Sequence, residues 1–598
     1  MLSPSTAAAA PSLDALYQRN TALMSRNARA EQMAQQTNPH PTLTFALSPT
    51  LHTTAPVLVT FITRADLTTP PPTGSLFAPL LPVAPLFPSP PAFPVAAMDD
   101  LLKRPGGCHT LYCVPSEAGA VQQVLLVLLG EVGGAVSDDS YRDATYTAVM
   151  ELKAKKVEHA AILLPAEHVV QRLDVITRIA VLSNHYFSKY LTKGQVHAVT
   201  AITLLNTSLL PLPTLQQVVH VASTVTEGTV FARELACDRA DTITPSYMQH
   251  ICQLVASTSK LKMTVVGQDE LRQQGLYLLA SVGQGARDGE KARLIVLEYR
   301  GDETNADKVI ALCGKGICFD AGGLHLKMTG EIENMHLDMS GAAVVLATIK
   351  TLASLQARVN CVATLSLAEN MIGPCAQKPL TIWPTVRGTV EVSNTDCEGR
   401  LALVDAFTYV QRHYRPHTVL DCATLTLGVW MICGDVMSAV FSNSDGLYGE
   451  LAACGEVVSE RLWRFPVWRE HREMLKNVEG YSDWKNYVGK VGESCTAASF
   501  LELFIDDGVR WAHVDFGGMS MTQKVHTTTP TPAICTAAHC RLHSLLSTRT
   551  HSVLLWCVSV CVQRTKWLPQ GGTGFGVQLF CEYILNHVAV TDANTTKA

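Results

Sequence analysis

The sequence predicts an α/β protein with two domains, a smaller N-terminal α/β domain and a larger C-terminal α/β domain with a central mixed sheet. Three observations favour this class. The chain has 598 residues, of which 47% are hydrophobic, so it can bury more than one core. Apolar strand patterns alternate with helical patterns, which is typical of a largely parallel sheet. The alternation occurs in two series, separated at about residues 205–225.

The first series begins with residues 122–130, a short apolar run that ends at a glycine and is predicted to be a buried strand. Residues 138–156 and 167–191 have apolar side chains at helical spacing, and residues 159–165 between them form a second apolar run. This order of strands and helices predicts an N-terminal α/β domain over residues 100–215.

The second series begins at residues 229–257 and predicts the larger domain, residues 216–598. Apolar runs rich in Val, Ile and Leu follow at short intervals, and each of them is expected to be a strand of one sheet. These runs are residues 262–267, 292–301 and 307–319.

Residues 1–99 are predicted to be a low-complexity, proline-rich extension. The uncharged run from Leu67 to Met98 contains 10 prolines in 32 residues, a density that excludes a membrane-spanning helix. The apolar run at residues 552–562 is too short to cross a bilayer, so no membrane association is expected. A cytoplasmic location is expected. Import into an organelle stays open as an alternative, because residues 1–65 are poor in acids and rich in Ser, Thr and Ala.

The composition limits the class of function. The formal net charge of −5 gives no electrostatic reason for the chain to bind nucleic acid or an anionic membrane. The 18 cysteines are dispersed through apolar segments, which predicts reduced thiols in the core rather than a disulfide framework. Such cysteine usage favours an intracellular compartment.

The stretch NTDCEGRLAL, residues 394–403, brings charged side chains together between a predicted strand and a predicted helix. Asp396, Glu398 and Arg400 alternate along it. In an extended backbone, alternate residues project from the same face, so two carboxylates and a guanidinium would crowd together. A group that offsets the repulsion between the carboxylates is therefore expected there.

A second stretch with reactive side chains, residues 314–343, follows the apolar run at residues 309–312. Each of its two lysines taken alone is typical of an ordinary surface residue, but glycines and apolar residues flank both. Together the two stretches supply four acids and three bases, and four clustered carboxylates require protonation, ion pairing or divalent cations. Two divalent cations would balance the four acids, as in two-metal hydrolases. The reactive residues of this second stretch are Lys315, Asp320, Lys327 and Asp338.

These residues match a known signature. NTDCEGRL differs from Asn-Thr-Asp-Ala-Glu-Gly-Arg-Leu only by Cys397 in place of alanine, and the upstream Lys, Asp, Lys and Asp follow one another at spacings of 5, 7 and 11. The sequence therefore resembles the leucine aminopeptidase (cytosol aminopeptidase) family of two-metal exopeptidases. The resemblance extends from about Phe231 to the C-terminal end and implies that residues 216–598 are a catalytic metallopeptidase domain.

The resemblance implies two divalent cations per subunit, zinc or manganese, bound by five side chains. One cation would take Asp320, Asp396 and Glu398, and the other would take Lys315, Asp320, Asp338 and Glu398. A lysine can ligate a metal only as the neutral amine. The pKa of Lys315 is therefore expected to be strongly lowered by the two cations.

The resemblance also implies the reaction. The cations activate a hydroxide that attacks the first peptide bond of a substrate with a free N-terminus, and leucine and other apolar residues are the expected first residues. Lys327 and Arg400 would be catalytic: Lys327 stabilises the oxyanion, and Arg400 holds a bicarbonate that takes the proton. Members of the family assemble as homohexamers, and the same assembly is expected here.

The substrate pocket is expected to be lined by Lys327, Met335, Thr424, Leu425 and Leu427. Leu427 stands where the family usually has glycine. Two interpretations of this leucine stay open. It narrows the pocket and alters the side-chain preference, or it packs into the core.

A segment at residues 523–566 departs from the family pattern. It contains no Asp or Glu, and its four Cys and four His lack the spacing of a standard zinc motif. We interpret it as a surface loop, or as sequence foreign to the mature protein. Two alternatives to an active peptidase stay open: a family member whose catalysis the insertion impairs, and an architectural DNA-binding protein. The lack of a Lys/Arg cluster disfavours the second.

Overall fold

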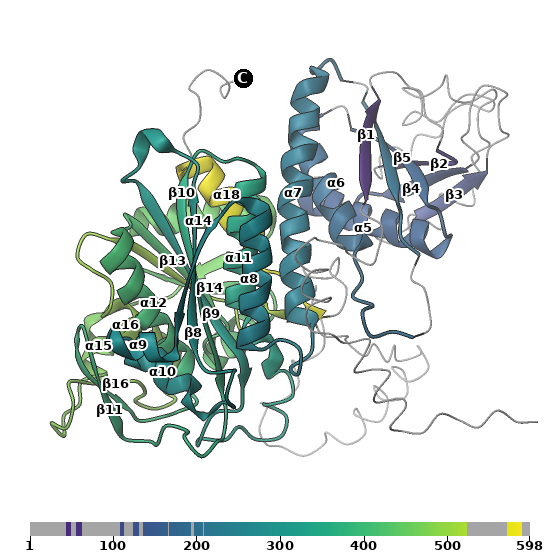
Figure 1. Cartoon of the computed structure of the whole chain (residues 1–598). Helices are drawn as coiled ribbons and strands as arrows, with labels where there is room; N and C mark the ends of the chain where they lie inside the picture. Colours follow the sequence, from purple (N-terminus) through teal and green to yellow (C-terminus); the bar gives the residue numbers. More distant parts are fainter. Residues whose placement is uncertain are drawn as a thin grey trace, which may run out of the picture.

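The computed structural model describes residues 43–48, 55–62, 108–112, 123–130, 136–165, 167–192, 197–206, 208–522 and 571–588. These residues form two lobes on either side of a long helix, α7 (Leu212–Cys237), as Figure 1 shows. Each lobe is built on its own sheet with helices packed against it. The predicted α/β class is confirmed.

The N-terminal lobe contains a six-stranded sheet in the order β1-β6-β5-β2-β4-β3. All neighbouring strands are parallel except the edge pair β3 and β4. Helices α5 and α6 bury their apolar faces against this sheet in one core. The elements are β1 (Thr44–Ser48), β2 (Val57–Ile62), β3 (Cys108–Tyr112), β4 (Gln123–Leu128), α5 (Asp138–Ala154), β5 (His159–Leu163), α6 (Val169–Asn184) and β6 (Ala201–Leu205).

Two strands of this sheet come from residues 1–99, so the prediction that these residues are an extension is wrong for β1 and β2. The strand β2 is an apolar VLVTFI run between β5 and β4, and all but one of its side chains are buried. The sequence did not predict this strand, because no helical pattern follows the short apolar run and the residues after it are rich in proline. The run Leu67–Met98 itself lies outside the described residues.

The C-terminal lobe contains an eight-stranded mixed sheet in the order β15-β14-β17-β13-β9-β10-β8-β7. The inner strands β17, β13, β9 and β10 are parallel, and antiparallel pairings flank them on both sides. The strands are β7 (Lys262–Gly267), β8 (Arg293–Arg300), β9 (Val309–Asp320), β10 (Asn360–Asn370), β13 (Thr418–Ala423), β14 (Ser438–Ser442), β15 (Leu462–Arg464) and β17 (Arg510–Asp515); β11 (Thr381–Thr385), β12 (Gly388–Val392) and β16 (Trp484–Lys485) form a small separate sheet.

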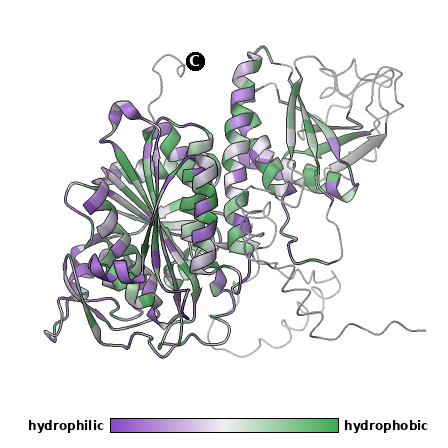
Figure 2. Cartoon of the chain, viewed as in Figure 1, coloured by the Kyte–Doolittle hydropathy of each residue, from purple (hydrophilic) through white to green (hydrophobic). Residues whose placement is uncertain are grey.

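Helices cover both faces of the large sheet and enclose one apolar core on each face. Figure 2 shows hydrophobic residues along the strands and hydrophilic residues on the outer helices and loops. One core lies against α7, α8, α11, α14 and α18, and the other lies against α9, α10, α12, α13 and α16. The helices are α8 (Pro245–Ser259), α9 (Gln268–Gln273), α10 (Tyr277–Val282), α11 (Ser340–Ser354), α12 (Glu398–Tyr414), α13 (Leu427–Cys433), α14 (Asp445–Val458), α15 (Arg469–Met474), α16 (Glu493–Glu502) and α18 (Val577–Tyr583).

The domain boundary placed at residue 215 falls inside α7, which continues without a break to Cys237. This helix packs against α6 of the N-terminal lobe and against α11 of the C-terminal lobe. An ion pair also joins the lobes, between Arg178 of α6 and Glu582 at 3.3 Å. The two lobes therefore share one helix, and no loop separates them at the predicted boundary.

The parallel strands bring reactive segments to one edge of the large sheet. Strand β9 is buried along nearly its whole length and ends at Asp320, β10 ends at Asn370, and β13 ends directly before Thr424. Helix α12 begins at Glu398. Because the carboxyl ends of parallel strands meet at the same edge, residues far apart in the sequence converge there.

The predicted insertion at residues 523–566 lies outside the described residues, between two paired strands. Strand β18 (Met521–Thr522) pairs in antiparallel register with β19 (Gly571–Gly572). Among the described residues, one helical segment, Met335–Ser354, is long and apolar enough to cross a membrane, but 89% of its apolar window is buried inside the fold. This segment contains α11 and belongs to the protein core.

Candidate metal and catalytic site

Lys315 lies within β9, and acids enclose its side chain. Its Nζ lies 2.8 Å from Asp338 Oδ1 and 2.9 Å from Glu398 Oε1, and it donates to the Thr424 carbonyl at 3.0 Å. Asp338 follows a 3-10 turn before α11, whereas Glu398 is the first residue of α12. Three elements that are distant in sequence thus place predicted metal ligands around one amine.

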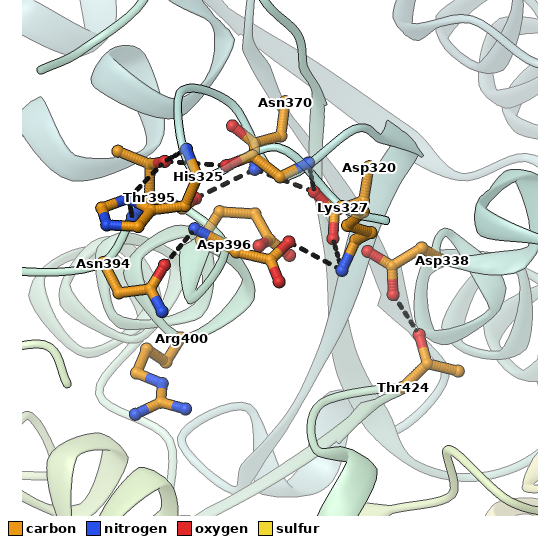
Figure 3. A network of polar contacts seen from close by, with 12 residues as sticks. Asp320, His325, Lys327, Asp338, Asn370, Asn394, Thr395, Asp396, Arg400 and Thr424 are labelled. Carbon is orange, nitrogen blue, oxygen red and sulfur yellow. Dashed lines mark hydrogen bonds and ion pairs between the residues drawn. The ribbon is translucent and has the colours of Figure 1, made fainter. Parts of the chain in front are cut away.

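Lys327 contacts the two remaining predicted acids. Its Nζ lies 2.8 Å from Asp320 Oδ2 and 2.7 Å from Asp396 Oδ1, and Figure 3 shows both carboxylates converging on this amine. Asp320 Oδ1 also accepts from the backbone N–H of Gly322 at 2.9 Å. The structure therefore brings all five predicted metal ligands and Lys327 into one region.

Hydrogen bonds of polar residues connect the loop after β9 with the loop before α12 (Figure 3). The Thr395 hydroxyl accepts from the His325 N–H at 2.9 Å and donates to the Gly322 carbonyl at 2.7 Å. Asn370 donates to Asp320 Oδ1 at 2.8 Å and to the Thr395 carbonyl at 3.0 Å. Only one feature of the sequence indicates these residues, which is that they occur inside segments that match the family.

Burial and mutual repulsion disfavour the ionised forms of three acids. Burial, together with the neighbouring carboxylates, raises the pKa of Asp338 to about 8 and the pKa of Asp396 to about 7. Burial and the charge of Asp320 also raise the pKa of Glu398. The site therefore favours a state in which protons or cations neutralise its acids.

The same acids keep the two lysines charged. Burial alone would lower the pKa of Lys315, but the three surrounding carboxylates outweigh it and raise this pKa above its ordinary value. The same balance raises the pKa of Lys327. The surrounding side chains alone therefore keep the Lys315 amine protonated. The neutral amine expected for a metal ligand requires cations bound among the same acids.

The acids offer unsatisfied oxygen atoms to a cation. Oxygen atoms of Asp320, Asp338 and Glu398 lie within 4.8 Å of one another, and all three residues are buried. Among the described residues, Asp338 Oδ2 and Glu398 Oε2 have no hydrogen-bond partner. Buried oxygens without partners are costly unless a proton or a cation takes them. Since divalent cations prefer carboxylate oxygen, this group fits one.

Arg400, predicted to be catalytic, lies in the first turn of α12 and is 2% exposed. Its Nη1 donates to the Asn486 carbonyl at 2.7 Å, and its Nη2 lies 4.0 Å from Glu493 Oε1. No described residue accepts from its Nε. Sequence reasoning missed Asn486 and Glu493, because neither belongs to a spaced motif. The guanidinium therefore keeps one buried N–H donor without an acceptor among the described residues.

The other predicted pocket residues lie in two segments. Met335 is half-buried in the turn before Asp338, and Thr424 donates its hydroxyl to Asp338 Oδ1 at 2.6 Å. Leu425 is half-buried, whereas Leu427 begins α13 with 58% of its surface exposed. The interpretation that Leu427 packs into the core is therefore wrong.

Gly399 leaves space for the Lys315 side chain, so Gly399→Ala is expected to weaken Mn²⁺ binding. A Cβ at this glycine would lie 2.5 Å from Lys315 Cε and 2.8 Å from its Nζ. The amine would have to move away from Asp338 and Glu398, and a change of this kind beside a metal site lowers affinity about 10- to 100-fold. Isothermal titration with Mn²⁺ measures the affinity.

Gly449→Ala in α14 is the matched control, because no atom lies within 4 Å of the added Cβ. This control is expected to keep the Mn²⁺ affinity and to raise the melting temperature slightly, since alanine favours a helix over glycine. Equal Mn²⁺ affinity in the two alanine variants would contradict the role assigned to Gly399.

The site combines buried acids that have unsatisfied oxygens with two lysines and an arginine at the strand ends of a mixed α/β sheet. This arrangement is typical of metal-dependent hydrolases. The catalytic domain of the cytosol aminopeptidase family matches residues 230–542. A cytosol aminopeptidase of Rickettsia prowazekii is 32% identical over 456 residues, which cover 72% of this chain and 87% of that protein. A probable cytosol aminopeptidase of Geobacter sulfurreducens is 35% identical over 420 residues, which cover 70% of this chain and 82% of that protein. The chain belongs to the cytosol aminopeptidase family and is a metal-dependent aminopeptidase, as predicted.

Solved structures share the fold. A mutant of tomato leucine aminopeptidase has a TM-score of 0.72 at 22% identity and covers 91% of this chain and 97% of its own. The bottromycin maturation enzyme BotP in complex with Mn has a TM-score of 0.68 at 24% identity and covers 89% of this chain and 99% of its own. These matches extend over both lobes, so the two-lobed architecture is that of known proteins.

Proposed function

We propose that this enzyme removes leucine and other apolar residues from the free N-terminus of peptides, with two divalent cations, manganese or zinc, in each subunit. The observation that carries the proposal is the pair of buried carboxylate oxygens without described partners, Asp338 Oδ2 and Glu398 Oε2, beside Asp320. They form the anionic, oxygen-rich surroundings that divalent cations bind.

The proposed ligands divide into two overlapping sets. Asp320, Asp396 and Glu398 would hold one cation, and Lys315 with Asp320, Asp338 and Glu398 would hold the other. When bound, the cations supply Lewis acidity and lower the pKa of water. Asp320 contacts one lysine and Glu398 contacts the other, so the two shared ligands connect both halves of the network.

Lys327 and Arg400 are the proposed catalytic side chains. Lys327 Nζ is held between two carboxylates and stays protonated, so it can donate to the oxygen of a scissile carbonyl as negative charge develops there. Arg400 cannot accept a proton, because a guanidinium stays charged. Its Nε–H is proposed to hold an anion such as bicarbonate, which accepts the proton in its place.

Lys327, Met335, Thr424, Leu425 and Leu427 are proposed to surround the first side chain of the substrate. Leu427 is exposed at the start of α13, so a ligand can contact it. A leucine fills space that the glycine usual in the family leaves open. We therefore expect the side-chain preference to differ from that of family members with the glycine.

The proposed activity is tested by release of p-nitroaniline from leucyl-p-nitroanilide by the full-length chain with added Mn²⁺ or Zn²⁺. Cleavage is expected to require the cation, to stop with EDTA and to be lost in Asp396→Ala. The control substrate is N-acetyl-leucyl-p-nitroanilide, which lacks the free amine and is expected to resist cleavage. A folded protein that cleaves neither compound would contradict the proposal and favour a catalytically impaired family member, and deletion of residues 523–566 would then test the insertion.

Assembly as a homohexamer and a cytoplasmic location are also proposed, with peptides as substrates and no nucleic acid or membrane partner. The family supports the cytoplasmic location, since its relatives are cytosol aminopeptidases. Light scattering during size-exclusion chromatography of the full-length chain measures the number of subunits. A monomer with full activity would contradict the proposed assembly.

The stability of the cation-free protein is expected to fall as the pH rises. The pKa values of Asp338 and Asp396 are raised to about 8 and about 7, so the folded protein binds protons that the unfolded chain loses above about pH 4. This contribution to stability is complete below about pH 4 and is lost as the pH rises through the folded pKa values. The melting temperature of EDTA-treated protein is therefore expected to fall progressively from about pH 4 to about pH 8.5, and Mn²⁺ is expected to raise it more at about pH 8.5 than at about pH 6.

Other buried acids, Asp405 and Glu460 among them, also contribute to this fall. The pKa values of Asp405 and Glu460 are raised to about 7 by burial, but both accept backbone N–H groups at helix starts and neither is a proposed metal ligand. Their titration does not respond to Mn²⁺, so the Mn²⁺-dependent part of the shift isolates the site. A Mn²⁺-induced rise of equal size at both pH values would count against this assignment.

A further inference from the structure

Asp515, at the end of β17, holds the segment that follows β13. It is fully buried, and its carboxylate accepts four hydrogen bonds, two on each oxygen. Oδ1 accepts from the N–H groups of Leu425 at 3.1 Å and Gly517 at 3.3 Å. Oδ2 accepts from the N–H of Thr426 at 3.1 Å and from its hydroxyl at 2.6 Å. Asp515 thus binds the backbone of a segment that carries predicted pocket residues.

The strand order makes this contact possible. Strands β13 and β17 are parallel neighbours, and Asp515 lies opposite Ala423, the last residue of β13. On the far side, Ser494 of α16 lies 2.7 Å from the Thr426 hydroxyl. A Cβ at Gly428 would lie 2.7 Å from Ser494 Oγ, so the start of α13 also packs closely on α16. The segment is therefore held between β17 and α16.

The other end of this segment contacts the metal and catalytic site. The Thr424 carbonyl accepts from Lys315 Nζ at 3.0 Å, and the Thr424 hydroxyl donates to Asp338 Oδ1 at 2.6 Å. Thr424 lies two residues before Thr426, and Leu427 follows Thr426 directly. Because so few bonds separate them, a shift of Thr426 moves the polar groups of Thr424 and the side chain of Leu427 together.

We propose that Asp515, acting through Thr426, is a positioning residue that sets the place of Thr424 and Leu427 and thereby the preference for the first side chain of the substrate. This inference rests on the proposed function and deepens it. A merely structural role of Asp515 at the start of α13 makes a different prediction: stability falls, while the preference between substrates stays the same.

Asp515→Asn, Thr426→Val and Thr426→Ser in the full-length chain test the proposal with leucyl- and alanyl-p-nitroanilide. Asn places an NH₂ group against two donors, and the resulting shift is expected to lower kcat/KM for the leucyl compound about 100-fold. Val removes the hydroxyl bonds alone and is expected to cost about 10-fold, whereas Ser keeps them and stays within about 3-fold of the wild type. The leucyl-to-alanyl ratio of kcat/KM is expected to fall about 10-fold in Asp515→Asn, because the pocket is displaced.

Asp506→Asn is the matched control, since Asp506 is 57% exposed and pairs with Arg387 at the surface. An unchanged leucyl-to-alanyl ratio in Asp515→Asn, or a loss of activity that follows the loss of melting temperature in all variants, would overturn the proposal. The control is expected to keep both the ratio and the melting temperature.

Hydrogen–deuterium exchange tests the same contact without activity. The amides of Leu425 and Thr426 are expected to exchange slowly in the wild type and faster in Asp515→Asn, with the rest of the sheet unchanged. If the wild type cleaves neither p-nitroanilide substrate, the proposed function fails. The exchange pattern of the two backbone amides would still support the positioning contact. Equal exchange of the two amides in both proteins overturns it.

Discussion

Glu398→Gln is expected to lower kcat/KM for leucyl-p-nitroanilide about 1,000-fold or more. Glu398 is 1% exposed, lies 2.9 Å from Lys315 Nζ and belongs to the group of three acids that fits a cation. Glutamine has nearly the same shape but no charge, so it cannot balance a cation. Mn²⁺ affinity, measured by isothermal titration, is expected to fall in parallel with activity.

The stability of this variant separates a metal ligand from a structural residue. Burial and Asp320 raise the pKa of Glu398, so its ionised form weakens the cation-free fold. Glu398→Gln is therefore expected to keep or raise the melting temperature of EDTA-treated protein and to remove most of the rise that Mn²⁺ causes. Glu456→Gln is the matched control, because Glu456 is 62% exposed and pairs with Arg461. Loss of activity that only follows loss of stability would exclude the ligand role.

The charged residues of the site could be predicted because they occur at short, fixed spacings. Lys315 and Asp320 lie on one strand, and Asp396, Glu398 and Arg400 lie within five consecutive residues. Local spacing of this kind survives folding, since a strand end and the start of a helix hold their residues in a fixed order. The structure adds that the two stretches meet, through the ion pairs of Lys315 and Lys327.

The residues that sequence reasoning missed act through strand neighbours. Asn370 reaches Asp320 because β10 lies beside β9, and Asp515 reaches Leu425 across 90 residues because β17 lies beside β13. A single polar residue at a strand end gives no periodic signal, and strand order cannot be read from local patterns. Motifs therefore predicted the reactive groups, but not the side chains that hold them.

The same reasoning explains the errors at the N-terminus. The strand β2 is six residues of apolar sequence, and its identity depends on β4 and β5 on either side. Without a following helix, one such run is not distinguished from an apolar stretch in a linker. Tertiary pairing decided the structure of this segment, whereas the alternation of strands and helices predicted the segments from residue 122 onward.

Lys327→Met is expected to lower kcat about 100- to 1,000-fold with a smaller change in KM. The Lys327 amine lies 2.8 Å from Asp320 and 2.7 Å from Asp396, and these acids keep it charged. A charge fixed in this way costs no reorganisation when an oxyanion forms, which is why its loss acts mainly on the transition state. Steady-state kinetics with leucyl-p-nitroanilide at saturating Mn²⁺ measure both constants.

Two further variants show whether the charge of Lys327 or its packing matters. Lys327→Arg keeps the charge and is expected to recover part of kcat, although the wider guanidinium cannot take the same position between two carboxylates. Lys476→Met is the matched control, since Lys476 is half exposed and pairs with Glu473 at 2.7 Å. If Lys327→Met raised KM and left kcat unchanged, the lysine would bind substrate and transition state equally, and the stabilisation of the oxyanion would have to come from the cations and the backbone.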